Sequence, residues 1–311
     1  MTSVLALLWA VGCTNVSEPE DELPPAGGGS GQPSDTGEPE GELPPPEPEP
    51  GEDTGTSDDG GSSTGEPLPE PEDDSSTGEP PPESGLGCEG RDDLLLCDDF
   101  EDGAIDGSLW EITENNGAEV SVDGTFAYHG SGALRVQLPS ADGARGSIRT
   151  HEDTVFPVPD NHFYGRAWFY LGPAVPETHC DAIAARGDLD GARAHYRLDS
   201  NGGNFNSRYV HNPTVEQHGG LRKHGYDVPL EEWTCIEWEY DGSQNGMRYW
   251  MNGEEVMEMT VTADSEEQPW VAPIFEEFEI GWRTYQGAPQ ADNYDIYWDA
   301  LALASFRIGC E

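Results

Sequence analysis

The distribution of aromatic and basic residues constrains the fold of this chain more than any other feature. From Thr14 to Gly87 the sequence contains no Phe, Tyr, Trp, His, Lys or Arg, and it consists mainly of Pro, Glu, Asp, Gly, Ser and Thr. Such a segment buries too little apolar surface to offset the entropy lost on ordering, so we expect residues 14–87 to be a disordered acidic linker. Residues 88–311 hold nearly all the aromatic residues, and about 220 residues suffice for one all-β core.

The charge of the chain argues against a nucleic-acid partner. The formal net charge is −48, and 21 of the 62 acidic residues lie in the linker. The remaining 41 acids outnumber the 14 bases in residues 88–311, whereas phosphate binding requires a basic surface. We therefore expect a strongly solvated protein that does not bind nucleic acid, and we expect a monomer.

The first 13 residues have the character of an export signal. A short apolar run ends in Ala10-Val11-Gly12-Cys13 and is too short to span a bilayer, which requires about 20 apolar residues. This end resembles the lipobox of bacterial lipoproteins, although no Lys or Arg precedes the run and Ala10 stands where Leu is commoner. The resemblance implies that residues 1–13 are a signal peptide and that Cys13 is acylated. The protein would then be anchored at the cell surface or outer membrane through lipid alone; a plain secretory signal is the alternative.

The cysteines suggest disulfide bonds outside the cytoplasm. Without Cys13, five cysteines remain: Cys88, Cys97, Cys180, Cys235 and Cys310. No Cys-x-x-Cys is present, so we do not expect a zinc site. We favour a Cys180–Cys235 bond with Cys88 bonded to Cys97 or Cys310, but the sequence does not fix the connectivity.

Short runs of alternating apolar residues predict an all-β domain. Many are rich in Val, Ile, Tyr, Trp and Phe, and Asn252-Gly253 is the signal of a two-residue hairpin turn. The candidate strands are Leu94–Phe100, Glu119–Val122, Ala133–Leu138, Ser147–Thr154, His162–Leu171, Asp181–Arg186, Ala192–Asp199, Asn204–His211, Thr234–Tyr240, Met247–Met251, Glu255–Thr262, Glu276–Tyr285 and Tyr294–Ala304. We expect a two-sheet antiparallel jelly-roll sandwich of the concanavalin A type. Its first and last strands should pair, bringing Cys88 near Cys310 and Glu101 near Asp299, and residues 212–227 should form a long polar loop.

Several segments resemble a known family. They are Cys97–Gly103 (CDDFEDG), Gly107–Trp110 (GSLW), His129–Val136 (HGSGALRV), His162–Leu171 (HFYGRAWFYL) and Tyr297–Ala304 (YWDALALA). Together they resemble the core domain of the fungal cellulose-induced secreted protein family, which has bacterial relatives. The resemblance covers most of residues 88–311. It implies a concanavalin-like jelly roll related to glucuronan and alginate lyases.

Three residues are candidates for catalysis. A lyase acting on a uronate polymer must neutralise the sugar carboxylate, abstract the adjacent proton and protonate the leaving oxygen. His195 and Arg197 share one face of their strand because they are two residues apart, and they resemble the His-x-Arg pair of the family's site. Tyr285 is the best match for the Tyr of that site. We assign Arg197 as carboxylate neutraliser, His195 as base or orienter and Tyr285 as proton donor; a polar sheet face without catalysis is the alternative.

Other residues are candidates for binding sugar. Tyr164, Arg166 and Trp168 share one face of the His162–Leu171 strand, where aromatic rings could stack on pyranose rings, although core packing explains them equally well. Asn204 and Arg283 are further candidates for contact with substrate.

A structural calcium ion is a separate expectation. Related jelly rolls hold calcium beside the first and last strands, and calcium prefers six to eight oxygen ligands. Glu101, Ser131 and Asp299 could supply such oxygens together with nearby carbonyl groups. The alternative is an exposed Glu and a capping Asp.

The sequence thus predicts a surface-anchored protein whose partner is a polysaccharide, expected to be an acidic one. The function would be that of a polysaccharide lyase cleaving uronate-containing polymers by β-elimination. The alternative is a non-catalytic carbohydrate-binding module. Glu237 and Glu239 share a strand face and suggest a glycoside hydrolase, but the Glu-x-Asp-x-x-Glu motif is missing, so this interpretation is weaker.

Overall fold

The computed structural model describes residues 86–211, 218–263, 265, 270–285 and 293–311. The expected signal peptide, Cys13 and nearly all of the expected linker lie outside this range. Leu86 is already buried, and its carbonyl oxygen accepts a hydrogen bond from Arg166 Nη2 over 3.1 Å. Among the described residues, no helix is long and apolar enough to cross a membrane.

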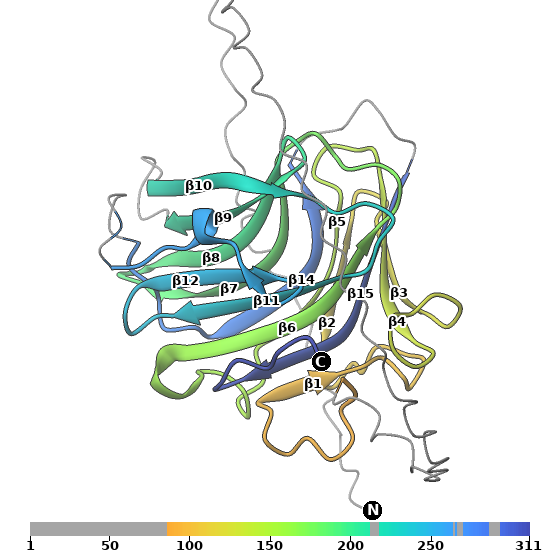
Figure 1. The fold of residues 1–311 in the computed structure, drawn as a ribbon, viewed down its shortest axis with the longest axis horizontal. Coiled ribbons are helices and arrows are strands. Elements are labelled where there is room, and N and C mark those ends of the chain that lie inside the picture. The colour runs from red at the N-terminus through yellow and green to blue at the C-terminus, as the bar shows by residue number, and fades with distance from the viewer. Residues whose placement is uncertain (1–85, 212–217, 264, 266–269, 286–292) are drawn as a thin grey trace, which may run out of the picture. The chain divides into compact units, whose positions relative to one another are not determined.

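Two antiparallel sheets pack face to face, which confirms the predicted jelly-roll sandwich (Figure 1). Sheet A has the order β13-β12-β11-β6-β15-β4-β3, and β1 also pairs with β15. Its strands are β1 (Leu96–Asp98), β3 (Glu119–Asp123), β4 (Ala133–Pro139), β6 (His162–Leu171), β11 (Thr234–Asp241), β12 (Gly246–Met251), β13 (Glu254–Glu255) and β15 (Asn293–Ala304). Sheet B has the order β10-β9-β8-β7-β14-β5-β2. Its strands are β2 (Glu111–Asn115), β5 (Arg145–Thr150), β7 (Cys180–Leu189), β8 (Ala192–Asn201), β9 (Asn204–His211), β10 (His218–Asp227) and β14 (Glu277–Thr284).

Alternating side chains from both sheets form the core between them. In β6, Phe163 and Phe169 are fully buried, and Gly165 lies between them on the same face. A Cβ atom at Gly165 would overlap the Trp238 ring, so the space of that side chain is taken by Trp238. Trp238 in turn stacks on Phe278 of sheet B with a ring separation of 5.7 Å. The alternation of apolar residues in β6 and β11 therefore shows which face of sheet A packs against sheet B.

The ends of the domain meet as predicted, because β1 pairs with β15 antiparallel and Leu96 lies opposite Leu303. The Asn252-Gly253 turn is also confirmed: both residues have positive φ angles, 51° and 84°, and they join Met251 to Glu254 in register.

One predicted strand and one predicted loop were wrong. Glu255–Thr262 contains only the end of β13 followed by a 3-10 turn, η2 (Met257–Met259). In this segment Met257 is 63% exposed while Met259 is fully buried, so the packing does not follow a strand's alternation. The expected loop at residues 212–227 is instead largely the strand β10, which pairs with β9; residues 212–217 lie outside the described range. A polar edge strand has no hydrophobic alternation that the sequence would reveal.

The disulfide prediction was partly wrong. Cys88 is bonded to Cys97 and Cys235 to Cys310, whereas Cys180 is a buried free thiol. Neither the Cys180–Cys235 bond nor the Cys88–Cys310 alternative forms. The reason is geometric: Cys180 packs in the core between the sheets, whereas Cys235 packs on the other side of sheet A against Trp168.

Candidate active site on the outer face of sheet B

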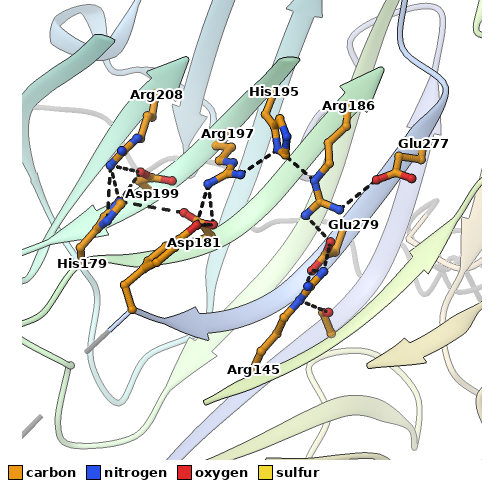
Figure 2. Close-up of polar contacts among 12 residues, drawn as sticks. Arg145, His179, Asp181, Arg186, His195, Arg197, Asp199, Arg208, Glu277 and Glu279 are labelled. Carbon is orange, nitrogen blue, oxygen red and sulfur yellow. Dashed lines mark hydrogen bonds and ion pairs between the residues drawn. The ribbon is translucent and has the colours of Figure 1, made fainter. Parts of the chain in front are cut away.

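The outer face of sheet B, which points away from sheet A, carries a continuous array of charged side chains (Figure 2). Residues two apart on one strand lie on the same face of the sheet. Residues that are paired on neighbouring strands form rows that run across the sheet. One row consists of Asn206, Asp199, Asp181, Arg283 and Arg145, on β9, β8, β7, β14 and β5.

A second row runs parallel to it. It consists of Arg208, Arg197, Ala184, Glu279 and Arg149 on the same five strands. Because the side chain of Ala184 is small, it leaves space between Arg197 and Glu279. A small hollow at this point is lined in part by Asp181, Ala184, Arg186, Glu279 and Arg283.

The three predicted catalytic residues lie together on this face. Arg197 Nη2 is 2.7 Å from His195 Nδ1, and Arg197 Nη1 donates to the Tyr285 hydroxyl over 2.7 Å. The same Nη1 donates to Asp181 Oδ2 over 2.8 Å, and the Tyr285 hydroxyl donates a short hydrogen bond to that oxygen. Arg197 is therefore the centre of a hydrogen-bonded cluster that also includes Asp181.

This arrangement bears on the predicted role of Arg197. Its side chain is almost completely buried, and both terminal nitrogens donate to His195, Asp181 and Tyr285. These contacts leave it poorly placed to clamp the carboxylate of a sugar. They place it well to stabilise negative charge on the Tyr285 oxygen, because a guanidinium hydrogen bond strengthens as its acceptor becomes charged.

His195 is held as a neutral imidazole. Burial lowers its pKa well below the usual 6.5, and the positive charges of Arg197 and Arg186 act in the same direction. Arg186 Nε donates to Nδ1 over 3.1 Å, and Arg197 approaches the same nitrogen. Since Nδ1 accepts from arginines, the imidazole proton lies on Nε2. His195 therefore orients the two arginines and is a poor proton acceptor at neutral pH.

The sequence analysis missed a second polar group beside Tyr285. His179, just before β7, lies 2.6 Å from both Asp199 Oδ2 and Arg208 Nη1 through its Nε2 atom. Its ring is parallel to that of Tyr285 at a separation of 4.6 Å. Asp199 could have been found by continuing the two-residue period of His195 and Arg197. His179 lies outside the predicted strands and gave no such signal.

Opposite charges hold the rest of the face together. Arg145 binds Glu279 with its Nη2 atom 2.6 Å from each carboxylate oxygen, and Arg186 pairs with both Glu279 and Glu277. Burial alone would raise the pKa of Glu279, but Arg186 and Arg145 outweigh it and lower that pKa to about 2. Glu279 is therefore ionised at all ordinary pH values.

Arginines are concentrated on this face. Seven of the 14 basic residues of the chain lie here: Arg145, Arg149, Arg186, Arg193, Arg197, Arg208 and Arg283. Most are paired with carboxylates. Arg283 lies over the Tyr285 ring, with its Cζ atom 4.4 Å from the centroid, and shows no ion pair with a carboxylate among the described residues. Asn204 lies on the same face at the start of β9, where its side-chain amide donates to the Gly202 carbonyl oxygen.

The predicted sugar platform on β6 is not part of this site. Tyr164, Arg166 and Trp168 lie on the outer face of sheet A, on the opposite side of the sandwich. Arg166 is buried and donates to the carbonyl oxygens of Leu86 and Ala300, while Trp168 stacks on Tyr128. These contacts pack Arg166 and Trp168 into the outer side of sheet A, and a role of the three residues in binding sugar stays a prediction.

The suspected hydrolase pair also lies on sheet A. Glu237 is bound by Arg307, and Glu239 accepts hydrogen bonds from Tyr164 and Arg248. Each carboxylate is thus engaged by its own partners. The pair offers no open acid and base for hydrolysis.

Glu101, Ser131 and Asp299 come together as expected, around the turn at residues 128–132. The carboxylate of Glu101 accepts from the backbone N–H groups of Ser131 and Gly132, and that of Asp299 accepts from Tyr128 and His129. A calcium ion would need oxygens that face it, whereas these oxygens face N–H donors. The turn itself accounts for both acids, so they fit a calcium site poorly, and the ion stays a prediction.

Three other groups of residues bring potential metal ligands together in the described part of the chain. The group containing Cys235 and Cys310 is unsuitable because these cysteines form a disulfide. His162, Glu239 and Asp241 lie on sheet A. His179, Asp181 and Asp199 lie within the candidate site, with ligand atoms all within 4.8 Å of one another.

Comparisons with known proteins agree with this architecture. Residues 99–305 match a polysaccharide-lyase-like family model described as "Cip1-like, core domain". The solved structure of "Cellulose induced protein, Cip1" is 23% identical, covering 70% of this chain and 100% of that one, with a TM-score of 0.55. An endo-β-1,4-glucuronan lyase from the fungus Trichoderma reesei is 15% identical, covering 68% and 96% of the two chains, with a TM-score of 0.52. No curated protein matches the sequence.

Proposed function

The chain belongs to the polysaccharide-lyase-like family through its Cip1-like core domain, and on that premise we propose that it cleaves a uronate-containing polysaccharide by β-elimination. The reaction would take place on the outer face of sheet B. The polymer would lie across β8, β7 and β14, over the hollow beside Ala184.

The concentration of arginine on this face is the observation that carries the proposal. The chain has a formal net charge of −48, yet half of its basic residues lie on one side of one sheet. A neutral glycan would have no need of them, whereas a polyuronate carries one carboxylate on each uronate residue. Guanidinium groups suit this partner because they bind carboxylates through two parallel hydrogen bonds.

Arg283 is the residue best placed to bind the uronate carboxylate. It lines the hollow, and among the described residues it has no carboxylate partner that would compete with the substrate. Neutralising the carboxylate acidifies the neighbouring C–H bond, which is the first requirement of the elimination.

Tyr285 serves as the proton donor to the leaving oxygen. Burial raises the pKa of its phenol above the usual 10, so the hydroxyl carries its proton at neutral pH. When the proton leaves, the phenolate is stabilised by Arg197 Nη1, which already lies 2.7 Å away. The proposed role of Arg197 thus shifts from binding the substrate carboxylate to stabilising Tyr285.

His179 is the better candidate for the base. His195 is neutral and its Nδ1 accepts from two arginines, whereas His179 contacts a single arginine, Arg208, together with Asp199. The Asp199 side chain holds the His179 ring through Nε2, and the ring packs parallel to Tyr285. In this mechanism His179 removes the proton next to the carboxylate, and His195 keeps Arg186 and Arg197 in place.

Binding without catalysis is the second candidate function. It is favoured by the near-complete burial of His195 and Arg197, whose polar groups point at one another. In that case the face would hold an acidic glycan through Arg283 and its neighbours without breaking a bond.

An absorbance assay separates the two functions. Protein is incubated with glucuronan, with alginate and with neutral cellulose, and the absorbance of unsaturated uronate ends is followed from pH 5 to 9. A lyase generates this signal from a polyuronate and none from cellulose. Retained binding to a polyuronate with no signal across that range would reject the lyase and leave the binding module.

We also propose that the protein is held at the cell surface by acylation of Cys13. The support is the sequence Ala10-Val11-Gly12-Cys13 at the end of the first apolar run. Mass spectrometry of the mature protein should find an N-terminal Cys13 carrying acyl chains. An unmodified Cys13 would reject the anchor and favour secretion.

A further inference from the structure

Two buried carboxyl groups face each other beside Tyr285. Asp181 on β7 and Asp199 on β8 are direct cross-strand partners on the outer face of sheet B. Asp199 is completely buried and Asp181 is 8% exposed. The Oδ1 atom of each is buried and has no hydrogen-bond donor among the described residues.

The Oδ2 atoms, in contrast, each have two polar partners. Asp181 Oδ2 accepts from Arg197 and Tyr285, and Asp199 Oδ2 lies 2.6 Å from His179 Nε2 and 3.3 Å from Arg208 Nη1. Buried acceptors without donors are unfavourable because they lose their hydrogen bonds to water and gain none in the protein. Two of them on directly opposed residues of neighbouring strands call for one shared explanation.

We propose that Asp181 and Asp199 share one proton between their Oδ1 atoms, and that this proton fixes Asp181 in the position that orients the Tyr285 hydroxyl. The proton turns two unsatisfied acceptors into one hydrogen bond and removes the repulsion between two adjacent negative charges. Asp199 is then the neutral partner, and Asp181 stays ionised beside Arg197. Asp181 and Asp199 are positioning residues in this arrangement.

The surrounding charges agree with this assignment. Burial raises the pKa of Asp199 to about 7, and the charge of Asp181 acts in the same direction. Burial would also raise the pKa of Asp181, but Arg197 outweighs it and lowers that pKa well below the usual range. Two carboxyls in contact release their protons in separate steps, so the pair retains one proton up to near neutrality.

Several other ionisable groups face or influence the pair. They are His179 and Cys180 at the start of β7, Arg197 on β8, Arg208 on β9, Arg283 on β14 with Tyr285 just after it, and, from sheet A, the Tyr240 and Tyr249 phenols. Arg197 and Arg208 already bring two positive charges to the two acids. A shared proton adds one more, whereas a divalent cation held by His179, Asp181 and Asp199 would add two, which favours a proton over a metal ion at this place.

The test compares Asp199→Asn with Asp181→Asn. The side-chain amide introduced by Asp199→Asn can donate to Asp181 Oδ1 and so mimics the protonated acid. Asp199→Asn should therefore fold, keep Tyr285 in place and lose the titration. Asp181→Asn removes the charge that Arg197 and Tyr285 bind and should reduce the melting temperature at every pH.

The first readout needs no enzymatic activity. Folded Asp199 holds its proton to a higher pH than in the unfolded chain, so the stability of the wild type relative to Asp199→Asn should fall as pH rises from about 4 to 7, then level off. The difference between the infrared spectra of the wild type and Asp199→Asn at pH 6 should contain the band of one protonated carboxyl; a difference is needed because burial also raises the pKa of Asp299, to about 6. A stability difference that does not change with pH, or a difference spectrum without this band, would overturn the shared proton.

The second readout rests on the proposed lyase function. Above pH 7 the pair loses its proton and the two charges repel, so wild-type kcat should decline there, whereas Asp199→Asn should keep its kcat to higher pH. Identical declines in both proteins would overturn the positioning role. If no polyuronate is cleaved by the wild type, the lyase function fails while the stability and infrared results still judge the shared proton.

A metal titration completes the test. Zinc, manganese and calcium salts are added separately to the wild type, and binding is measured by calorimetry. The proposal expects no binding that depends on Asp199. Stoichiometric binding that is lost in Asp199→Asn would show that the two carboxylates are metal ligands and would overturn the shared proton.

Discussion

Arg197 Nη1 donates to the Tyr285 hydroxyl over 2.7 Å although their strands are not neighbours. Arg197 is on β8, Tyr285 directly follows β14, and β7 lies between these strands. The contact is bridged by Asp181 of β7, which binds both residues. Three adjacent strands thus converge on one phenol, and the predictions below follow from this convergence and from the charges around it.

Replacing Arg283 should weaken catalysis as well as substrate binding. In Arg283→Ala the uronate carboxylate loses the partner that neutralises it, so kcat for a polyuronate should fall about tenfold or more and KM should rise. Steady-state kinetics on glucuronan and alginate measure both changes. Arg135→Ala is the matched control, since Arg135 pairs with Asp295 on sheet A; an equal effect of both changes would contradict a specific role for Arg283.

Removing either histidine should separate their roles. His179→Ala should reduce kcat by about 10²–10⁴-fold because the proposed base is lost, and added imidazole should restore part of the activity. His195→Ala should also lower activity, because Arg186 and Arg197 lose a common acceptor, but imidazole in solution should not replace an orienting contact. Rescue of His195→Ala and not of His179→Ala would reverse the assignment of the base.

Acid should destabilise the sheet B face through Glu279. Its folded pKa is about 2, below the value near 4.5 expected in the unfolded chain, so its contribution to stability is present above about pH 4.5 and is lost as pH falls toward 2. The shift corresponds to about 3 kcal/mol. Denaturant unfolding from pH 6 down to pH 2 should show a steeper loss in the wild type than in Glu279→Gln.

At neutral pH, Glu279→Gln should itself cost about 3–5 kcal/mol, because it leaves Arg145 without its buried carboxylate partner and Arg186 with Glu277 alone. The matched control is Glu111→Gln, which breaks one ion pair of a largely exposed carboxylate with Arg149. That change should cost no more than about 1 kcal/mol. Equal losses of unfolding free energy in the two variants would show that burial of the ion pairs around Glu279 contributes little to stability.

The two disulfides should contribute unequally. Cys235–Cys310 closes a loop of 75 residues and Cys88–Cys97 a loop of only 9. On chain entropy alone the longer bond stabilises the fold by about 4.5 kcal/mol and the shorter by about 2.6 kcal/mol. Unfolding of the paired Cys→Ser variants measures both; a larger loss on removing Cys88–Cys97 would contradict this ranking.

The sequence predicted the interior strands well because their side chains alternate. In β6, Phe163 and Phe169 mark the core face without ambiguity, and the same two-residue period put His195 and Arg197 on one face. The period does not say which of two sheets a strand joins. Tyr164, Arg166 and Trp168 were candidates for binding sugar, with core packing as the alternative, and the period alone could not show that they lie on the other side of the sandwich from His195 and Arg197.

Which residues bond to one another in the site depends on the order and pairing of the strands. The sequence of a single strand does not reveal either. Asp181 reaches Tyr285 only because β7 lies between β8 and β14, and Glu279 meets Arg145 only because β14 pairs with β5. These are contacts between residues more than 100 positions apart. The disulfide pairing failed for the same reason, because the faces occupied by Cys180 and Cys235 follow from the sheet order.

The most direct test of the account compares the wild type with Tyr285→Phe on a soluble polyuronate. The account predicts that the wild type releases unsaturated uronate ends, and that Tyr285→Phe binds the polymer but releases them at least about 10²-fold more slowly. Tyr297→Phe on sheet A should behave as the wild type. Undiminished release of unsaturated ends by folded Tyr285→Phe would contradict the assignment of this phenol, and with it the site built around Arg197 and Asp181.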